Sequence, residues 1–405
     1  MKSKKMGLIP KLILGIILGI ILGYVTMVVS NKGFENFQII MKIVVTLANF
    51  FSLFLKFIIP LMILAYITKG IADLTQGAGK LLGFTTFVSY FSTLIAGTIA
   101  YIVAINLFPH FIADGLFNNL ADEGAFIQPI FSIDLKPLFD VTSAVVLAFV
   151  VGLSVSTMRG KEIGNVTYDF FTEFSAIITK VLNKVIIPFL PFYILSTFAN
   201  LTYSGQAFSI LSVLWKVFLT VLILHILYLI AMFTFAGSIS KKSPVKLLKN
   251  QVPGYLAAVG TQSSAAAIPV NLVCAEKNGT SKQIREFVIP LCANIHLSGS
   301  MITITCCVTS VLLMNNMNIG LGIIIPFILT LAVVMVASPG APGGAIMSAV
   351  PFLSMVGIDP DGAIAGLLIT MYITQDSFGT ACNVSGDNAI AIIVDNFYKK
   401  YINKN

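Results

Sequence analysis

An uncharged stretch that runs from residue 287 to residue 358 is the feature that most constrains the fold of this chain. A membrane-spanning helix needs about 20 apolar residues, so the stretch is far too long for a single helix. Polar, glycine-bearing interruptions divide it at NIHLSGS (294–300) and at SPGAPGG (338–344). Interior prolines remove helical hydrogen bonds. We therefore predict a broken spanning segment, 287–314, followed by a re-entrant hairpin, 319–356, that enters from outside.

The composition places the whole chain in the membrane class. Hydrophobic residues make up 57% of the 405 residues and charged residues only 10%, whereas a soluble domain has about 25% charged residues. The net charge of +8 comes from basic residues scattered between apolar segments, which indicates membrane orientation and no nucleic-acid partner. The five cysteines lack the spacing of a metal site or a disulfide scaffold, so we expect them to be packing residues.

Basic clusters alternate with poorly basic connections along the first 250 residues or so. Six spans explain this alternation if the N-terminus is cytoplasmic. The basic start of the chain resembles a signal peptide but has no obvious small-residue cleavage site, so we interpret the first apolar run as a retained helix. The sixth span contains His225, which we interpret as a hydrogen-bonded helix contact rather than a ligand.

The next apolar segment, 251–275, has basic residues on both flanks: Lys249 before it, and Lys277 and Lys282 after it. A spanning helix would place one flank outside, against the preference of basic residues for the cytoplasmic side. We therefore expect a hairpin that enters from the cytoplasm and returns there. Its centre, GTQSSAAAIPV (260–270), supplies the turn, because non-helical backbone at membrane depth is tolerated where it lines a cavity.

The last apolar segment predicts a long helix with a polar stripe. Spacings of four, three and four residues place four polar side chains on one face at ~100° per residue. Inserting one aspartate into the hydrocarbon of a membrane costs roughly 2.5 to 3.5 kcal/mol of free energy. Two aspartates on the same helix face therefore indicate an ion or substrate path. The four residues are Asp376, Thr380, Asn383 and Asp387.

The ends of this helix follow from capping residues and charge. Asp359 and Pro360 predict an N-cap and a first helical residue. The helix ends before the basic Lys399, which puts the C-terminus in the cytoplasm. The second half therefore consists of a hairpin, a broken helix, a second hairpin and a striped helix. Interrupted segments at matching positions of inverted repeats are typical of a transporter's binding site.

Three alternative interpretations of the interruptions and the two aspartates are close helix packing, an intramembrane protease and a channel. Small residues that only permit close helix packing would explain single glycines but not three polar interruptions beside two aspartates. An intramembrane aspartyl protease needs two converging carboxylates, whereas residues eleven apart on one helix are separated by about 16 Å. A channel is compatible with the composition, but two proline-interrupted hairpins are more typical of gates than of a continuous pore.

Three motifs carry a resemblance to a known family. They are TQSSAAAIPVN (261–271), SPGAPGG (338–344) and DSFGTACNVSGD (376–387). With them the chain resembles the dicarboxylate/amino acid:cation symporter family over nearly its whole length. The residues of these motifs are most similar to those of the sodium/serine-threonine symporter branch.

The resemblance implies an all-α polytopic membrane protein with the glutamate-transporter-like fold. That fold has eight transmembrane helices and two re-entrant helical hairpins, built as inverted repeats, and it forms homotrimers. Residues 1–240 would be mainly scaffold and trimerisation helices, of which the third and sixth move with the transport part. Residues 241–405 would form the transport core.

Site roles follow from the same resemblance. Ser263 and Ser264 would bind the substrate carboxylate, and Asp376 would bind its ammonium. Asp387 and the Asn383 carbonyl would hold sodium. The remaining substrate-binding candidates are Thr380, Asn383, Gly379 and the tip of the second hairpin, Ser338, Pro339 and Gly340. Oxygen ligands suit sodium, and a helix N-terminus suits a carboxylate.

Three departures from the family pattern affect these expectations. Gly379 and Gln262 stand where members with acidic substrates have arginines. The seventh-helix motif contains His296, Ser298 and Ser300 and lacks the family's aspartate, so one sodium site is incomplete. Asn294, His296 and Ser298 are the candidate ligands left there, and proton coupling through His296 stays open.

We therefore predict a sodium-coupled symporter of small neutral amino acids, of the serine/threonine type, with an elevator-like mechanism. No cofactor is expected beyond the coupling ions, and both termini would face the cytoplasm of a bacterial cell. The alternative is a symporter of acidic amino acids or dicarboxylates. That alternative needs a cation beside the substrate side chain, and the sequence of the last helix and of both hairpins offers none.

Overall fold

The computed structural model describes residues 8–31, 38–74, 79–112, 127–139, 141–159, 163–205, 207–335, 338, 343–360 and 362–402. These ranges form an all-helical protein without strands, which confirms the all-α part of the predicted fold class. The helices of the first half are α1 (Leu8–Asn31), α2 (Gln38–Leu74), α3 (Gly79–Leu107), η2 (Phe108–His110), α4 (Val141–Met158), α5 (Asn165–Val181), η4 (Leu182–Ile186), α6 (Ile187–Tyr203) and α7 (Ala207–Ser240).

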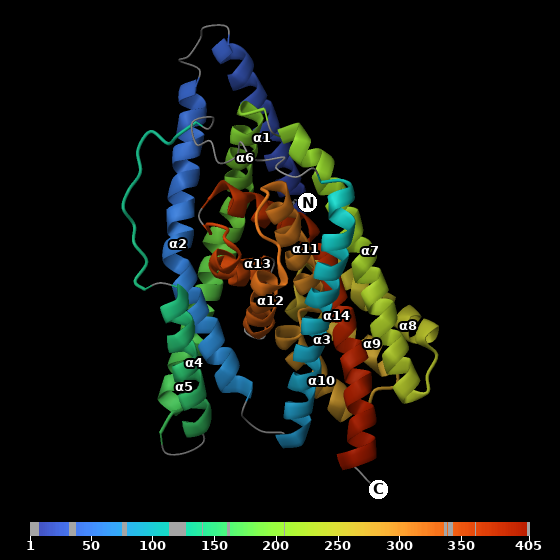
Figure 1. Ribbon diagram of the computed structural model, residues 1–405. Helices are drawn as coiled ribbons and strands as arrows, with labels where there is room; N and C mark the ends of the chain where they lie inside the picture. The colour runs from blue at the N-terminus through green and yellow to red at the C-terminus, as the bar shows by residue number, and fades with distance from the viewer. Residues whose placement is uncertain are drawn as a thin grey trace, which may run out of the picture.

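The second half is more interrupted. Its helices are α8 (Pro244–Thr261), α9 (Ser264–Lys277), α10 (Lys282–Ile295), α11 (Ser298–Met314), α12 (Leu321–Met335), α13 (Gly344–Ala349), η5 (Val350–Val356), α14 (Ala363–Phe397) and η6 (Tyr398–Ile402). Helices α11 to α13 lie in the centre, with α2, α4 and α5 on one side and α3, α7 and α8 on the other (Figure 1).

Several helices are long and apolar enough to cross a bilayer. By length and composition, four segments of the described chain pass this test, and a fifth passes if α5 and α6, bent by 50°, count as one span. Large apolar side chains on their outer faces, such as Phe87, Val150 and Phe235, are exposed, as expected for lipid contact. The predicted number of eight spans stays a prediction, because other helices, such as α14, are not among these segments.

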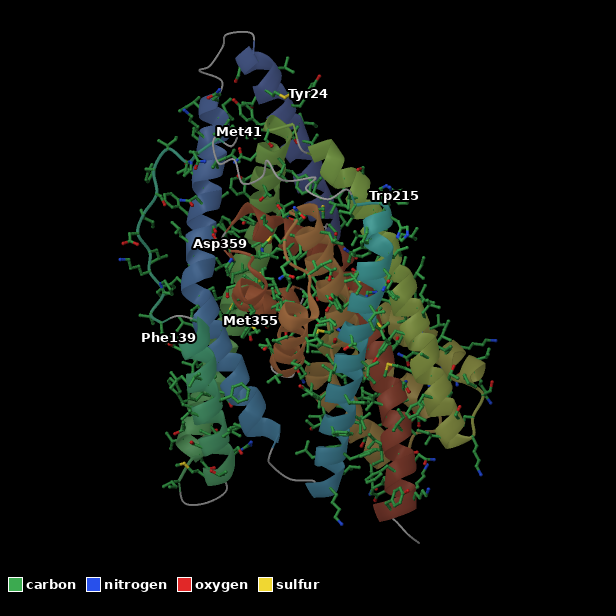
Figure 2. All side chains as sticks on the ribbon, viewed as in Figure 1. Tyr24, Met41, Phe139, Trp215, Met355 and Asp359 are labelled. Atoms are coloured by element: carbon green, nitrogen blue, oxygen red, sulfur yellow. The ribbon has the colours of Figure 1, made fainter. Side chains whose placement is uncertain are left out.

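Helix α1 packs against α6 along a ladder of glycines. Gly15, Gly19 and Gly23 lie four residues apart on α1. A Cβ atom added at any of them would run into a backbone carbonyl oxygen of α6, those of Pro191, Leu195 and Ala199 in turn. The two backbones are therefore in direct contact. Tyr24 of α1 and Met41 of α2 lie at the same end of the molecule (Figure 2), and Met41 is buried there.

Helices α8 and α9 form the first predicted hairpin. Their outer ends lie side by side, since Lys242 Nζ donates to Asn278 O at 2.6 Å and Asn278 Nδ2 donates to Leu247 O at 3.3 Å. At the turn, Gln262 has a left-handed backbone with φ of 54°. The chain thus returns to the end where it started, as the flanking basic residues predict.

A buried network of amides fixes this hairpin to α14. Asn388 Nδ2 donates to Gln251 Oε1 at 2.6 Å, and Gln251 Nε2 donates to Asn271 Oδ1 at 3.0 Å. Asn271 Nδ2 in turn donates to Val384 O of α14 at 2.8 Å. All the side chains in the network are uncharged, so their burial is offset by hydrogen bonds alone.

The predicted break in the helix is present, and helices pack together on either side of the second predicted hairpin tip, whose re-entrant position stays a prediction. The break between α10 and α11 falls at His296 and Leu297. In the second hairpin the helices after the tip fold back on α12, and Ser348 Oγ donates to Ser338 Oγ at 3.2 Å. The predicted tip residues Pro339 and Gly340 lie outside the described residues.

The predicted start of the last helix is wrong. Asp359 is not its N-cap, because Gly362 occupies that position and α14 begins at Ala363. Asp359 and Pro360 instead belong to a turn that is closed by a bond from Gly362 N–H to Asp359 O at 3.1 Å. The turn thus gives Gly362 N–H a backbone partner in place of a capping side chain.

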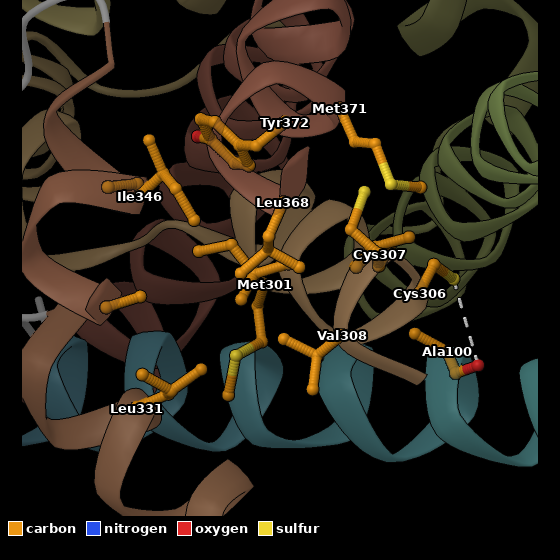
Figure 3. Packing of buried hydrophobic residues seen from close by; sticks show 14 of the residues in the cluster. Ala100, Met301, Cys306, Cys307, Val308, Leu331, Ile346, Leu368, Met371 and Tyr372 are labelled. Atoms are coloured by element: carbon orange, nitrogen blue, oxygen red, sulfur yellow. Dashed lines mark hydrogen bonds between the residues drawn. The ribbon is translucent and has the colours of Figure 1, made fainter. Parts of the chain in front are cut away.

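Helix α11 is the centre of the core. Every one of its residues is buried, and its apolar side chains pack against α3, α12, α13 and α14 (Figure 3). Met301, Val308, Leu331 and Leu368 meet in this cluster. All five cysteines are free and buried, which confirms that they are packing residues. A polar site on α14 is therefore surrounded by rigid, close-packed helices.

Candidate functional site

The polar stripe predicted on the last helix lies on α14 and is buried. Asp376, Thr380, Asn383 and Asp387 are each at most 5% exposed. The stripe faces the second hairpin near Asp376, the start of α11 near Asn383, and the break before α11 near Asp387. One face of one helix thus collects polar contacts from the second hairpin and from the segment that joins α10 to α11, which are far apart in the sequence.

Asp376 is held by the tip of the second hairpin. Its Oδ2 accepts a bond from Gly343 N–H at 2.7 Å. Its Oδ1 accepts from the Tyr372 hydroxyl at 2.9 Å and from Thr380 Oγ1 at 3.5 Å. Tyr372 was missed in the sequence, although it lies four residues before Asp376 and extends the same stripe. A carboxylate with these neutral donors is stable when buried, and it can still exchange one of them for a cation.

Asn383 binds the first turn of α11. Its Oδ1 accepts from Gly299 N–H at 2.7 Å and from Ser300 N–H at 3.2 Å, and its Nδ2 donates to Ser300 Oγ at 2.9 Å. The Tyr372 hydroxyl lies 3.1 Å from Ser300 Oγ. Ser300 therefore links Asn383 to the Asp376 cluster. The free N–H groups of a helix start are satisfied here by a side chain of another helix.

The tip of the first hairpin reaches the same region of α14. Gln262 Nε2 donates to Ser377 Oγ at 2.9 Å, one residue after Asp376. Ser263 is the N-cap of α9, and its hydroxyl accepts from Ala266 N–H at 3.3 Å. Ser264 is buried in the first turn. Both predicted serines therefore lie at a helix N-terminus, where anionic groups are favoured.

Asp387 and His296 form a buried pair at the far end of the stripe. His296 Nδ1 lies 2.9 Å from Asp387 Oδ1, and its Nε2 lies 3.0 Å from Ser92 Oγ on α3. The Ser92 hydroxyl lies 2.7 Å from the Tyr228 hydroxyl on α7. Both ring nitrogens of His296 therefore have hydrogen-bond partners. Ser92 and Tyr228, both missed in the sequence, tie the pair to two neighbouring helices.

Two oxygens near this pair have unused lone pairs. Asp387 Oδ2 is buried without a hydrogen-bond partner among the described residues. The Ser298 hydroxyl is also buried there, with no partner beyond the thiol of Cys382, which is a weak one. Oxygens of this kind suit a hard cation such as sodium. Within the described chain, no three His, Cys, Asp or Glu side chains gather into a transition-metal site.

Two predicted site residues are placed differently from expectation. Asn294 is exposed on α10, where its Nδ2 donates to Pro290 O at 3.1 Å, so its side chain does not join the cluster. Gly379 does not adjoin open space, because a Cβ atom there would meet Thr303 Oγ1 at 3.3 Å and Gly299 O at 3.6 Å. The α14 backbone at Gly379 packs directly against α11.

The arginines of the chain lie away from the stripe. The guanidinium of Arg285 donates to Glu276 at 3.0 Å and to Thr280 O at 3.1 Å. Arg159 lies over the ring of Tyr168, 3.4 Å from its centroid. Among the described contacts of the stripe, no lysine or arginine side chain takes part. The proposed substrate region is therefore acidic or neutral.

A comparison with protein families identifies this architecture. A family model described as "Sodium:dicarboxylate symporter family" matches residues 8–397. The chain belongs to the sodium:dicarboxylate symporter family. This membership confirms the resemblance given by the three sequence motifs, and it makes the chain a relative of multi-pass membrane transporters rather than of enzymes.

Individual relatives of this symporter-family chain carry names of amino acid transporters. Excitatory amino acid transporter 3 of Oryctolagus cuniculus is 28% identical over 265 residues, which cover 64% of this chain and 49% of the relative. The Homo sapiens protein of the same name is 27% identical over 265 residues, with the same coverage. Excitatory amino acid transporter 1 of Ambystoma tigrinum is 25% identical over 256 residues, 62% of this chain and 46% of the relative. The matched part thus spans about half the length of these relatives.

Proposed function

We propose that this protein is a sodium-coupled symporter that imports small neutral amino acids of the serine/threonine type. The observation that carries the proposal is the position of Asp376. Its buried carboxylate lies on the helix that both hairpin tips contact, and Gly343 of the second tip is one of its donors. A buried carboxylate in this position suits a substrate ammonium, and family membership supplies the sodium coupling.

The substrate would bind between the two hairpin tips. Its ammonium would bind Asp376, and its carboxylate would bind the α9 N-terminus at Ser263 and Ser264. Thr380 and Asn383 would contact the substrate from α14, and Ser338, Pro339 and Gly340 would close over it. Gly343 N–H already donates to Asp376 Oδ2 at 2.7 Å, so a bound ammonium would share this carboxylate with the second tip or displace it. We propose that the second hairpin opens to exchange the substrate.

Sodium would bind at the other end of the stripe. Asp387 Oδ2 and Ser298 Oγ supply buried oxygens with free lone pairs, and the Asn383 carbonyl is the further ligand. His296 already uses Asp387 Oδ1, so this carboxylate has one oxygen left for the ion. We expect fewer sodium ions per substrate than in relatives whose seventh-helix motif retains its aspartate.

The family also guides the proposed assembly. We propose eight spans and two re-entrant hairpins, with both termini cytoplasmic and a homotrimer in a bacterial cytoplasmic membrane. Residues 1–240 would be mainly scaffold, and residues 241–405 would form the moving transport core. Support comes from the hairpin shape of α8 and α9, whose outer ends meet at Lys242 and Asn278. The direct contact between α1 and α6 suits a rigid scaffold.

Acidic amino acids are the second candidate substrate. The relatives are named excitatory amino acid transporters, which favours this class. An acidic substrate would bring a second carboxylate into the site, and burying an unpaired charge costs several kcal/mol. Arg159 and Arg285 are engaged elsewhere, so the described site offers no arginine to pair with it. A serine hydroxyl or an alanine methyl needs no such partner.

Uptake into proteoliposomes decides between the two substrates. Labelled serine, alanine and aspartate are offered under an imposed sodium gradient, with a proton gradient as the comparison. Serine and alanine should accumulate faster than aspartate. Wild-type protein that prefers aspartate or glutamate would contradict the neutral substrate.

A further inference from the structure

His225 in the middle of α7 is completely buried and lies outside the substrate and sodium ligands proposed above. Its Nε2 is 3.0 Å from Gly299 O in the first turn of α11. A carbonyl oxygen only accepts hydrogen bonds, so Nε2 carries the hydrogen of this contact. The other ring nitrogen, Nδ1, is buried without a partner among the described residues. The imidazole is therefore held in place through its Nε2 side.

The carbonyl that His225 binds belongs to a peptide group whose N–H also makes a hydrogen bond. The N–H of the same group, that of Ser300, points at Asn383 Oδ1 at 3.2 Å. In a planar trans peptide the C=O and N–H point in opposite directions, so a donor on one side orients the group toward an acceptor on the other. His225 on α7 and Asn383 on α14 thus hold opposite ends of one peptide group.

Other contacts also hold this peptide, because Gly299 lies in the first turn of α11 and Thr303 Oγ1 lies 3.1 Å from His225 Nε2. Gly299 follows the helix break at His296 and Leu297, where no regular turn precedes it. On the α14 side, a Cβ atom at Gly299 would overlap the Gly379 carbonyl oxygen and would lie 2.5 Å from Cys382 Cβ. Thr303 Oγ1 adds a second bond to Gly299 O at 3.1 Å. The side facing α7 is held by the imidazole.

We infer that His225 is a positioning residue, which aims the Gly299–Ser300 peptide at Asn383 and so sets the geometry of the shared substrate and sodium region. The inference rests on the proposed function, because Asn383 is its point of action. It assigns a role in transport to α7, a helix that contributes none of the proposed ligands. The reach of the donor, rather than the presence of a ring, is what matters.

Three substitutions separate donor position from simple packing. In His225→Gln the amide nitrogen lies at about the place of Nε2, whereas in His225→Asn it lies at about the place of Nδ1 and falls short of Gly299 O. His225→Ala removes the donor altogether. The control is Leu229→Ala, which shortens another buried side chain of α7 without touching Gly299. Each variant is reconstituted, and uptake of labelled serine is measured against serine and sodium concentration, together with the Tm in detergent.

The loss of one buried hydrogen bond corresponds to about a five- to tenfold change in an equilibrium constant. We expect His225→Asn and His225→Ala to raise the KM for serine and the half-saturating sodium concentration by about this factor. His225→Gln should return both to within about twofold of wild type. Leu229→Ala should lower the Tm and the maximal rate while both constants stay unchanged.

The outcomes distinguish the inference from the proposed function. Wild-type protein that takes up no amino acid under a sodium gradient would overturn both. Wild-type uptake together with unchanged constants in His225→Asn would overturn the inference alone, as would a glutamine variant no better than alanine. If His225→Asn does not fold, the comparison of His225→Ala with His225→Gln takes its place, because only the glutamine keeps a donor near the position of Nε2. Equal constants in these two variants would overturn the inference.

Discussion

Replacing Gly299 by alanine tests the contact between α11 and α14 on which the site depends. The added Cβ would overlap the Gly379 carbonyl oxygen and lie 2.5 Å from Cys382 Cβ, so the helices must separate. Overpacking of this kind costs about 1–3 kcal/mol. Separation would also stretch the bond from Gly299 N–H to Asn383 Oδ1, now 2.7 Å, and an unmade buried hydrogen bond costs about 1–3 kcal/mol. The gain from helix propensity is only about 0.5–1 kcal/mol.

We expect Gly299→Ala to lower the free energy of unfolding by about 1–5 kcal/mol and to abolish most uptake. Thermal unfolding in detergent measures the first effect, with a fall in Tm of roughly 2–4 °C per kcal/mol, and proteoliposome uptake measures the second. The matched control is Gly83→Ala on α3, where an added Cβ meets nothing within 4 Å. It should be neutral or slightly stabilising. If both variants kept the wild-type Tm and uptake, the close contact of α11 with α14 would be refuted.

Three further predictions follow from the stripe and the hairpins. Asp387→Asn should weaken the sodium dependence of uptake more than it alters substrate preference, and a reversal potential that shows three coupled sodium ions in the wild type would contradict the incomplete sodium site. In a background without native cysteines, reporter cysteines near Lys249 and Lys282 should be labelled from the same side, and labelling from opposite sides would make the first hairpin a span. Asn388→Leu should lower the free energy of unfolding by about 1–3 kcal/mol, because Gln251 loses the partner of its Oε1, and an unchanged Tm would show that the amide network contributes little.

Much of the architecture was predictable because it depends on local properties of the sequence. Periodicity placed Asp376 and Asp387 on one face, and both are buried in one stripe. Basic flanks predicted the first hairpin, and the prolines predicted a break before α13. These features follow from hydropathy, charge and backbone chemistry over short windows, so no knowledge of packing partners was needed.

The contacts between distant segments were not predictable in this way. Periodicity says that Gly379 lies beside the stripe, but not that Thr303 of α11 fills the adjoining space. The partnership of His225 with Gly299 O depends on how α7 and α11 cross, and a single histidine in an apolar helix gives no sign of it. Asn294 is polar and close to the break, yet the buried face of α10 excludes it. Such outcomes are decided by which helix faces meet.

The glycine ladder between α1 and α6 limits how the two helices can shift. The glycines recur every four residues, and so do the α6 carbonyls that they face, from Pro191 to Ala199. A slide of less than one helical turn would bring a bulky neighbour such as Ile16 or Leu18 onto a carbonyl oxygen. The displacement that places glycines on carbonyls again is therefore one repeat of four residues, about 6 Å. The ladder thus holds α1 in one register against α6. Any gradual sliding of helices during a transport cycle has to occur at other helix contacts.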